Sequence, residues 1–151
     1  RAGFVVHRCT GPADRDARTE KGQIMDPPRK ILIATDLSAA SDSAIELGGS
    51  LARGLGASVL LVCSFDPSPL LPRVNLSTAP NVWADAMKEK EAAIGRILKK
   101  YCAESLVCTQ CETRVLTETS AAKAIVDCAR AEDVNLIVVG SHGRTGLDLS
   151  L

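Results

Sequence analysis

A chain of 151 residues, of which 46% are hydrophobic, is long enough to form one globular domain with its own core. The 18 Lys and Arg residues balance the 18 Asp and Glu residues, so the net charge of zero gives no long-range attraction to nucleic acid or to an anionic membrane. The apolar runs are too short to span a bilayer or to form the core of a signal peptide. We therefore expect a cytoplasmic protein, with no nucleic acid and no membrane among its partners.

The first part of the chain differs from the rest. Charged residues recur between Arg8 and Lys21 without an apolar period, a pattern typical of a disordered arm. We expect residues 1–28 to be a disordered N-terminal extension and residues 29–151 to be the folded domain, with the natural start near Met25. An arm that binds a partner is the alternative.

Strands and helices are predicted to alternate after this extension. Residues 31–34 read as a short buried strand, and the polar residues 35–38 include N-cap types, so a helix should begin there. Small and apolar residues at steps of three and four extend that helix to Leu55. Residues 58–63 form the next strand, and an irregular proline-containing excursion follows it. That excursion either covers a ligand or is an ordinary connection.

The second half of the chain repeats the same alternation. We predict a long helix over residues 83–101, a strand over 111–116, a helix over 120–130 and a strand over 136–139. Short, buried strands that alternate with helices predict an α/β fold with a doubly wound parallel sheet and right-handed crossovers.

The cysteines are scattered along the chain and do not form a regular framework. They are Cys9, Cys63, Cys102, Cys108, Cys111 and Cys128. We interpret them as reduced, small apolar residues. The two-residue spacing of Cys108 and Cys111 is that of a redox or zinc pair, but an extended segment would send these side chains to opposite faces, and no second pair at metal spacing exists. We assign no metal site.

A glycine-spaced loop follows the last predicted strand. Gly140, Gly143 and Gly146 allow backbone N–H groups to converge on an anion such as phosphate. The spacing differs from the Walker loop and from the dinucleotide fingerprint, and the KH-type clamping loop joins two helices rather than following a strand. A sharp turn that merely reverses the chain is the alternative.

The chain resembles the universal stress protein family over about residues 29–150. Three segments carry the resemblance: Ala34-Thr35-Asp36, Val59-Leu60-Leu61-Val62, and the run from Ile137 to Gly146. The resemblance implies an adenine nucleotide alpha hydrolase-like, Rossmann-like three-layer sandwich. It also implies that the predicted strands, numbered along the chain, lie in the order 3-2-1-4, with the first and fourth strands side by side.

The ATP-binding branch of this family implies roles for individual residues. Thr35 and Asp36 would lie at the nucleotide, with Asp36 at the ribose or adenine edge, and backbone groups of Ser64 would read adenine. Val139 would pack against the nucleoside. The glycine loop would hold phosphate through Gly140, Ser141, His142, Gly143 and Arg144. The alternatives are that Asp36 only caps a helix and that His142 and Arg144 are solvated loop residues.

The resemblance also implies that part of the family's pattern is missing. A second glycine with a hydroxyl partner would lie nine residues beyond Gly143, past Leu151, and the fifth strand would follow it. We therefore expect half of the phosphate clamp to be absent and the sheet edge beside the fourth strand to be open. Family members commonly dimerise through the fifth strand, so a homodimer would be weakened.

These observations predict a domain that binds an adenine nucleotide, ATP with or without Mg²⁺, in a stress-response or signalling role. No catalytic residue is evident, so ATP hydrolysis would be slow at most. The alternative is a nucleotide-independent protein-interaction module whose protein partner the sequence does not name. A nucleotidyl-transfer enzyme of the same fold group is a third interpretation, although residues 35–38 lack its usual Ser-Gly-Gly loop.

Overall fold

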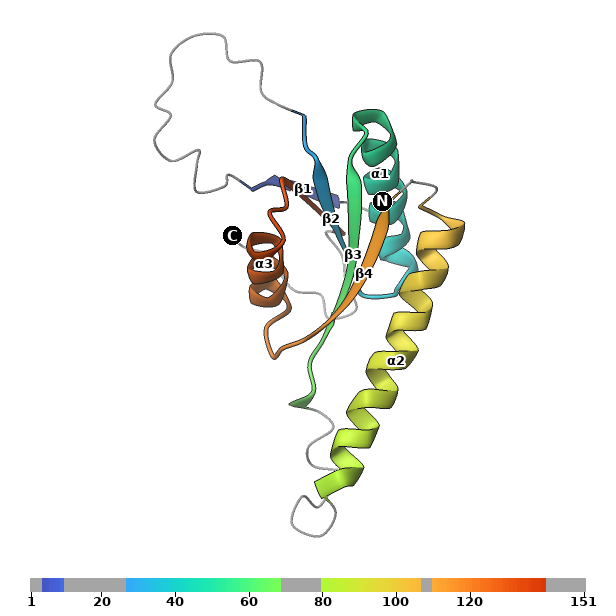
Figure 1. Ribbon diagram of the computed structural model, residues 1–151, viewed down its shortest axis with the longest axis vertical. Helices are drawn as coiled ribbons and strands as arrows, with labels where there is room; N and C mark the ends of the chain where they lie inside the picture. Colours follow the sequence, from blue (N-terminus) through green and yellow to red (C-terminus); the bar gives the residue numbers. More distant parts are fainter. Residues whose placement is uncertain (1–3, 10–26, 69–79, 107–109, 141–151) are drawn as a thin grey trace.

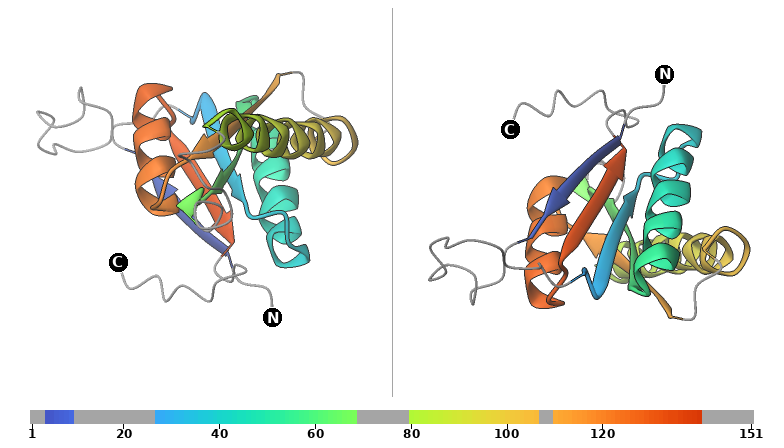
Figure 2. Two further views of the ribbon diagram at one scale, coloured as in Figure 1. Left: turned by 90° about the horizontal axis from the view of Figure 1, so that it is seen from below. Right: turned by 90° about the horizontal axis from the view of Figure 1, so that it is seen from above.

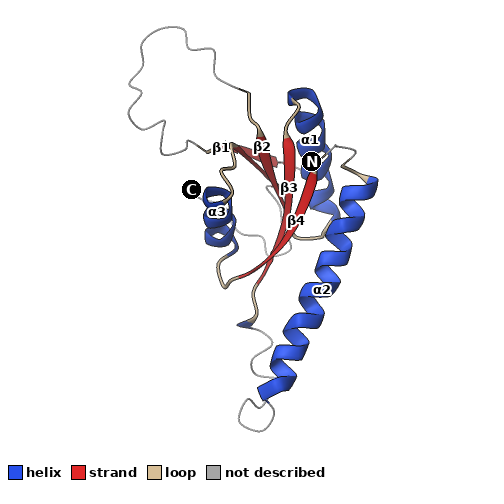
Figure 3. Cartoon of the chain, in the orientation of Figure 1, coloured by secondary structure: helices blue, strands red, loops and turns tan. Residues whose placement is uncertain are grey.

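The computed structural model describes residues 4–9, 27–68, 80–106 and 110–140. The strands are β1 (Phe4–Arg8), β2 (Lys30–Thr35), β3 (Ser58–Phe65), β4 (Cys111–Thr117) and β5 (Leu136–Gly140). The helices are α1 (Ala39–Leu55), α2 (Pro80–Glu104) and α3 (Ala121–Ala131). Each strand and helix predicted after residue 30 is present, with ends that extend or shift by a few residues (Figure 3).

The strands form one mixed sheet in the order β1-β5-β2-β3-β4 (Figure 1). β2 pairs in parallel with β3 on one side and with β5 on the other, and β3 pairs in parallel with β4. The predicted order 3-2-1-4 corresponds to β4-β3-β2-β5 and is confirmed. The fold is therefore the predicted α/β fold with a doubly wound, largely parallel sheet.

The predicted open edge beside β5 is wrong. β1 pairs antiparallel with β5 along its length, from Phe4 opposite Gly140 to Arg8 opposite Leu136. The N–H of Cys9 extends the pairing by donating to the carbonyl of Asn135 at 3.0 Å. The apolar run at the start of the chain thus satisfies backbone groups that would otherwise face water. Residues 10–26 lie outside the described residues, so the boundary at residue 28 stays a prediction.

The helices cover opposite faces of the sheet. α1 and α2 lie on one face and α3 lies on the other (Figure 2). The chain moves outward from β2 to β3 and β4 with helices on the first face, then returns past β2 to β5 through α3 on the second face. Right-handed crossovers require this change of face when the direction of travel reverses.

Two groups of buried side chains hold the three layers together. The first core cluster lies between the sheet and α1 and α2, and the second lies between the sheet and α3. The first consists of Ile31, Ile33, Ala44, Ile45, Ala52, Ala57, Val59, Leu61, Cys63, Ile94, Leu98, Leu106 and Val138. The second consists of Leu32, Ala34, Leu60, Val62, Cys128, Ala129, Val134 and Ile137. Successive residues of β2 and β3 alternate between the clusters, which explains why these strands read as continuous apolar runs.

α2 extends well past the sheet. Its C-terminal half packs on the first core cluster through Ile94 and Leu98, whereas its N-terminal half reaches beyond the carboxyl ends of the strands (Figure 1). Val82 in that half is exposed. In the described part of the chain, no helix has both the length and the apolar character needed to cross a bilayer.

The interpretation of all cysteines as reduced is wrong for two of them. Cys102 near the end of α2 and Cys111 at the start of β4 form a disulfide, with their Cα atoms 6.0 Å apart. The chain reverses between the helix and the strand, and this reversal brings the two residues together. Cys63, Cys128 and Cys9 are free thiols, as predicted, while Cys108 lies outside the described residues.

Removal of this disulfide should destabilise the domain under oxidising conditions. The bridge closes a short loop between residues 9 apart in sequence, and loop-closure entropy predicts that Cys102→Ser lowers the free energy of unfolding by about 2–3 kcal/mol. Urea titrations monitored by circular dichroism would measure it. In excess dithiothreitol the wild type and the variant should unfold alike, and a difference of the same size with and without reductant would contradict the prediction.

Gly48 should be required for the close approach of α1 to β2. A Cβ atom at this position would lie 2.6 Å from Cγ1 of the fully buried Ile33, so Gly48→Ala should lower the free energy of unfolding by about 1–3 kcal/mol through overpacking. Gly54 of the same helix faces open space. The matched control Gly54→Ala should be neutral or stabilising by up to about 1 kcal/mol, as helix propensity predicts. Equal effects in urea denaturation would contradict this account.

Candidate functional site

The carboxyl ends of the parallel strands meet at one edge of the sheet. Ala34 of β2 lies opposite Val139 of β5, so Asp36, just past the end of β2, and Gly140, the last residue of β5, both lie at this edge. Between β2 and β5 the chain connections diverge, because α1 lies on one face and α3 on the other. Ligands of open α/β sheets bind at such a switch point. The structure therefore brings together the ends of the two strands that the sequence analysis selected.

Side-chain hydrogen bonds build the turn between β2 and α1. Buried Thr35 shares a hydrogen bond of 2.7 Å with the hydroxyl of Ser41, and its Oγ1 accepts from the N–H of Leu37 at 3.0 Å. Oδ1 of Asp36 accepts from the N–H of Ser38 at 3.0 Å and also from its hydroxyl. Asp36 thus orders an Asx turn ahead of the helix, whereas the N-cap residue itself is Ser38.

Leu37 has an unusual backbone conformation within this turn. Its φ is 63°, in the left-handed region that a branched, bulky residue rarely adopts. The N–H of Leu37 donates to the hydroxyl of Thr35, and the Leu37 side chain packs against the first core cluster. Surrounding contacts therefore maintain a strained residue at the switch point, and such residues cluster at functional sites.

The end of β3 contributes a thiol, a hydroxyl and an aromatic ring to the same edge. Burial raises the pKa of Cys63 to about 11, with a further contribution from Asp36 and an opposing one from Lys90, so the thiol stays neutral near pH 7. Phe65 lies under the ammonium group of Lys90, whose Nζ is 5.0 Å from the ring centroid. The hydroxyl of Ser64 is buried and has no hydrogen-bond partner among the described residues.

Lys90 is a residue that sequence reasoning missed. The sequence by itself favours a solvated charged face here, because lysine and glutamate alternate around Lys90. Lys90 is exposed, and the packing of α2 also places its ammonium group over Phe65 at the end of β3, where it influences the pKa of Cys63. No local pattern distinguishes Lys90 from its charged neighbours, so only the packing of the helix on the sheet could reveal it.

The predicted phosphate loop is described only at its start. Val139 is half-buried and packs against the second core cluster, and Gly140 is the last residue of β5. Ser141, His142, Gly143 and Arg144 lie outside the described residues. Their roles in holding phosphate stay predictions.

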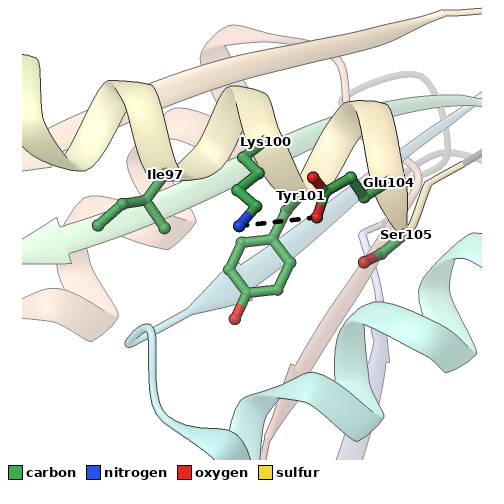
Figure 4. A pocket seen from close by; sticks show the side chains of 5 residues that line it. All are labelled: Ile97, Lys100, Tyr101, Glu104 and Ser105. Atoms are coloured by element: carbon green, nitrogen blue, oxygen red, sulfur yellow. Dashed lines mark ion pairs between the residues drawn. The ribbon is translucent and has the colours of Figure 1, made fainter.

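A surface hollow of about 370 Å³ lies elsewhere, at the C-terminal end of α2 (Figure 4). Its lining residues are Ile97, Lys100, Tyr101, Glu104 and Ser105. Tyr101 donates its hydroxyl to Asp42 of α1 at 2.9 Å, which raises the pKa of the tyrosine. Lys100 forms an exposed ion pair with Glu104 at 3.9 Å. None of the residues predicted from the sequence lines this hollow, so we place the candidate site at the strand ends.

Known structures share this fold. A universal stress protein solved in complex with cAMP has 22% identity and a TM-score of 0.54, with 75% of this chain and 76% of that chain covered. The hypothetical protein MJ0577 has 19% identity and a TM-score of 0.65, with 80% and 79% covered. The universal stress protein UspA from Lactobacillus plantarum has 19% identity and a TM-score of 0.52, with 80% and 82% covered.

The sequence itself gives the family. No curated protein matches the chain significantly. The sequence pattern of the universal stress protein family, however, matches residues 27–150, which is most of the chain and includes every described element except β1. The chain therefore belongs to the universal stress protein family.

Proposed function

We propose that this universal stress protein domain binds an adenine nucleotide, ATP with Mg²⁺, at the carboxyl ends of β2 and β5. The observation that carries the proposal is the register of these two strands, in which Ala34 lies opposite Val139. In this register, the Asp36 turn and the glycine loop begin at adjacent points on one edge of the sheet. A nucleotide could then contact both loops at once, with its phosphates on backbone N–H groups.

The described residues at this edge fit a nucleotide chemically. Val139 is half-buried and offers apolar surface to a base or ribose, and Thr35 and Asp36 form a preorganised turn at the same edge. Ser64 supplies a buried hydroxyl with no partner among the described residues. Sites that bind small molecules commonly combine an apolar lining with a few placed polar groups. The cAMP complex of a related fold lends further support.

The proposal includes no catalytic residue. We propose that ATP acts as a signal or stability ligand in a stress response, and we expect hydrolysis at a slow rate at most. We also propose the cytoplasm as the location of the protein.

We further propose that two copies associate through β1. This strand lies at the edge of the sheet, and its consecutive residues Val5 and Val6 are 38% and 44% exposed. Because consecutive side chains point to opposite faces, both faces of the strand are partly uncovered. An exposed apolar edge strand is a template for pairing with another chain. A second copy pairing along β1 would continue the sheet across both subunits.

ATP binding should be saturable and should depend on the glycine loop. We expect isothermal titration calorimetry with Mg-ATP to give saturable heat for the wild type. Gly143→Asp places a side chain and a negative charge in the predicted phosphate cradle and should abolish that heat. The same change at Gly54, an exposed helical position that faces open space, should leave binding intact.

Two results of this titration would count against the proposed function. A folded wild-type chain that gives no heat would favour the nucleotide-independent interaction module. Binding that survives Gly143→Asp unchanged would move the nucleotide away from the glycine loop.

A charge on β1 should weaken self-association. Val6→Lys buries an unpaired ammonium group in the proposed strand pairing, so the dimer should dissociate at lower concentration in sedimentation velocity experiments. Val82→Lys introduces the same charge on an exposed part of α2 and serves as the control. A wild type that remains monomeric at every concentration, or a Val6→Lys dimer as stable as the wild type, would contradict this interface.

A further inference from the structure

The hydroxyl of Ser64 differs from the other polar side chains at the strand ends. Thr35 is hydrogen bonded to Ser41, and Asp36 accepts from Ser38. Thr117 at the end of β4 donates to the carboxylate of Glu91 at 2.9 Å. Among the described residues, Ser64 Oγ is the buried side-chain oxygen without a hydrogen-bond partner. Buried polar groups are nearly always paired, so an unpaired one calls for a functional explanation.

The surroundings of Ser64 are apolar on the face that it shares with its strand neighbours. Leu60 and Val62 of β3 point into the second core cluster, and alternation places Ser64 on the same face. Leu116, its register partner on β4, packs against that cluster as well. The hydroxyl is thus a lone hydrogen-bonding group at the end of an apolar surface, an arrangement that suits a flat heteroaromatic ring with polar edges.

Ser64 also lies level with the proposed nucleotide site. Thr35 of β2 is opposite Cys63 of β3. Asp36 and Ser64 are the residues that follow this pair, so they lie at the same level of the sheet edge. As a whole, Ser64 is only half-buried, although its Oγ is covered. Rotation about χ1 moves a serine hydroxyl between staggered positions without any change in the backbone. A ligand that arrives at the edge can therefore receive this hydroxyl.

We propose that the Ser64 side chain hydrogen bonds the adenine base of the bound nucleotide and thereby determines affinity for the base. This role rests on the proposed function, to which it adds a direct hydrogen bond between the Ser64 hydroxyl and the base. A hydroxyl can donate to a ring nitrogen of adenine or accept from its amino group. The unpaired hydroxyl of the ligand-free protein destabilises the fold, and the base supplies its missing partner.

The test combines ATP affinity with the stability of the ligand-free protein. Ser64→Ala should raise the Kd for Mg-ATP by about 2- to 13-fold, as expected for the loss of one hydrogen bond. Its melting temperature without nucleotide should equal or exceed that of the wild type, because the change removes a buried unpaired group. Ser64→Thr keeps a hydroxyl and should restore affinity toward the wild-type value.

The control lies on the same strand. Ser58 at the amino end of β3 donates its hydroxyl to the carbonyl of Arg29 at 3.2 Å, far along the strand from the site. Ser58→Ala should leave the Kd for Mg-ATP unchanged, so any general effect of removing a serine hydroxyl from β3 would be visible there.

The possible outcomes separate this role from the proposed function. Saturable ATP binding with the same Kd in the wild type and Ser64→Ala would overturn the role of Ser64 and leave nucleotide binding standing. A lower melting temperature of ligand-free Ser64→Ala would also overturn it, because the hydroxyl would then have a structural partner such as an ordered water. No binding by the folded wild type would remove both the function and this role.

Discussion

The structure depends on the burial of β2 between two parallel neighbours. Ile31, Leu32 and Ile33 have no exposed surface, and their side chains alternate between the two core clusters. One strand therefore joins α1 and α2 on one face to α3 on the other. Asn135 fixes the amino end of this arrangement, since its side-chain oxygen accepts from the N–H groups of Arg29 and Lys30. The register set there determines which residues meet at the opposite end.

The candidate site follows from this central strand. Because β3 and β5 flank β2 in parallel, the carboxyl ends of all three strands lie at one edge of the sheet. The turn at that edge is held by Thr35 and Asp36, and it keeps Leu37 in a left-handed conformation. A rigid scaffold thus supports a strained turn, which is how functional loops are commonly positioned.

The two edge strands of the sheet are each held in place by a different contact. β1 pairs antiparallel with β5 and takes the place that would otherwise be exposed. At the other edge, the disulfide between Cys102 and Cys111 links the start of β4 to α2. Both devices restrain strands that have a neighbour on one side only, where pairing with other chains is a hazard. The exposed valines of β1 leave one edge able to pair with a second copy.

The sequence by itself determined the alternation of strands and helices, the order of the four parallel strands and the residues at the ends of β2 and β5. The alternation and the strand-end residues depend on local periodicity or on a contiguous motif, whereas the strand order is what the resemblance to the family implies. Tertiary structure decided the place of β1, the disulfide between Cys102 and Cys111, the position of Lys90 and the unpaired hydroxyl of Ser64. These features arise from contacts between distant segments, and no local pattern encodes which distant groups will meet once the layers pack.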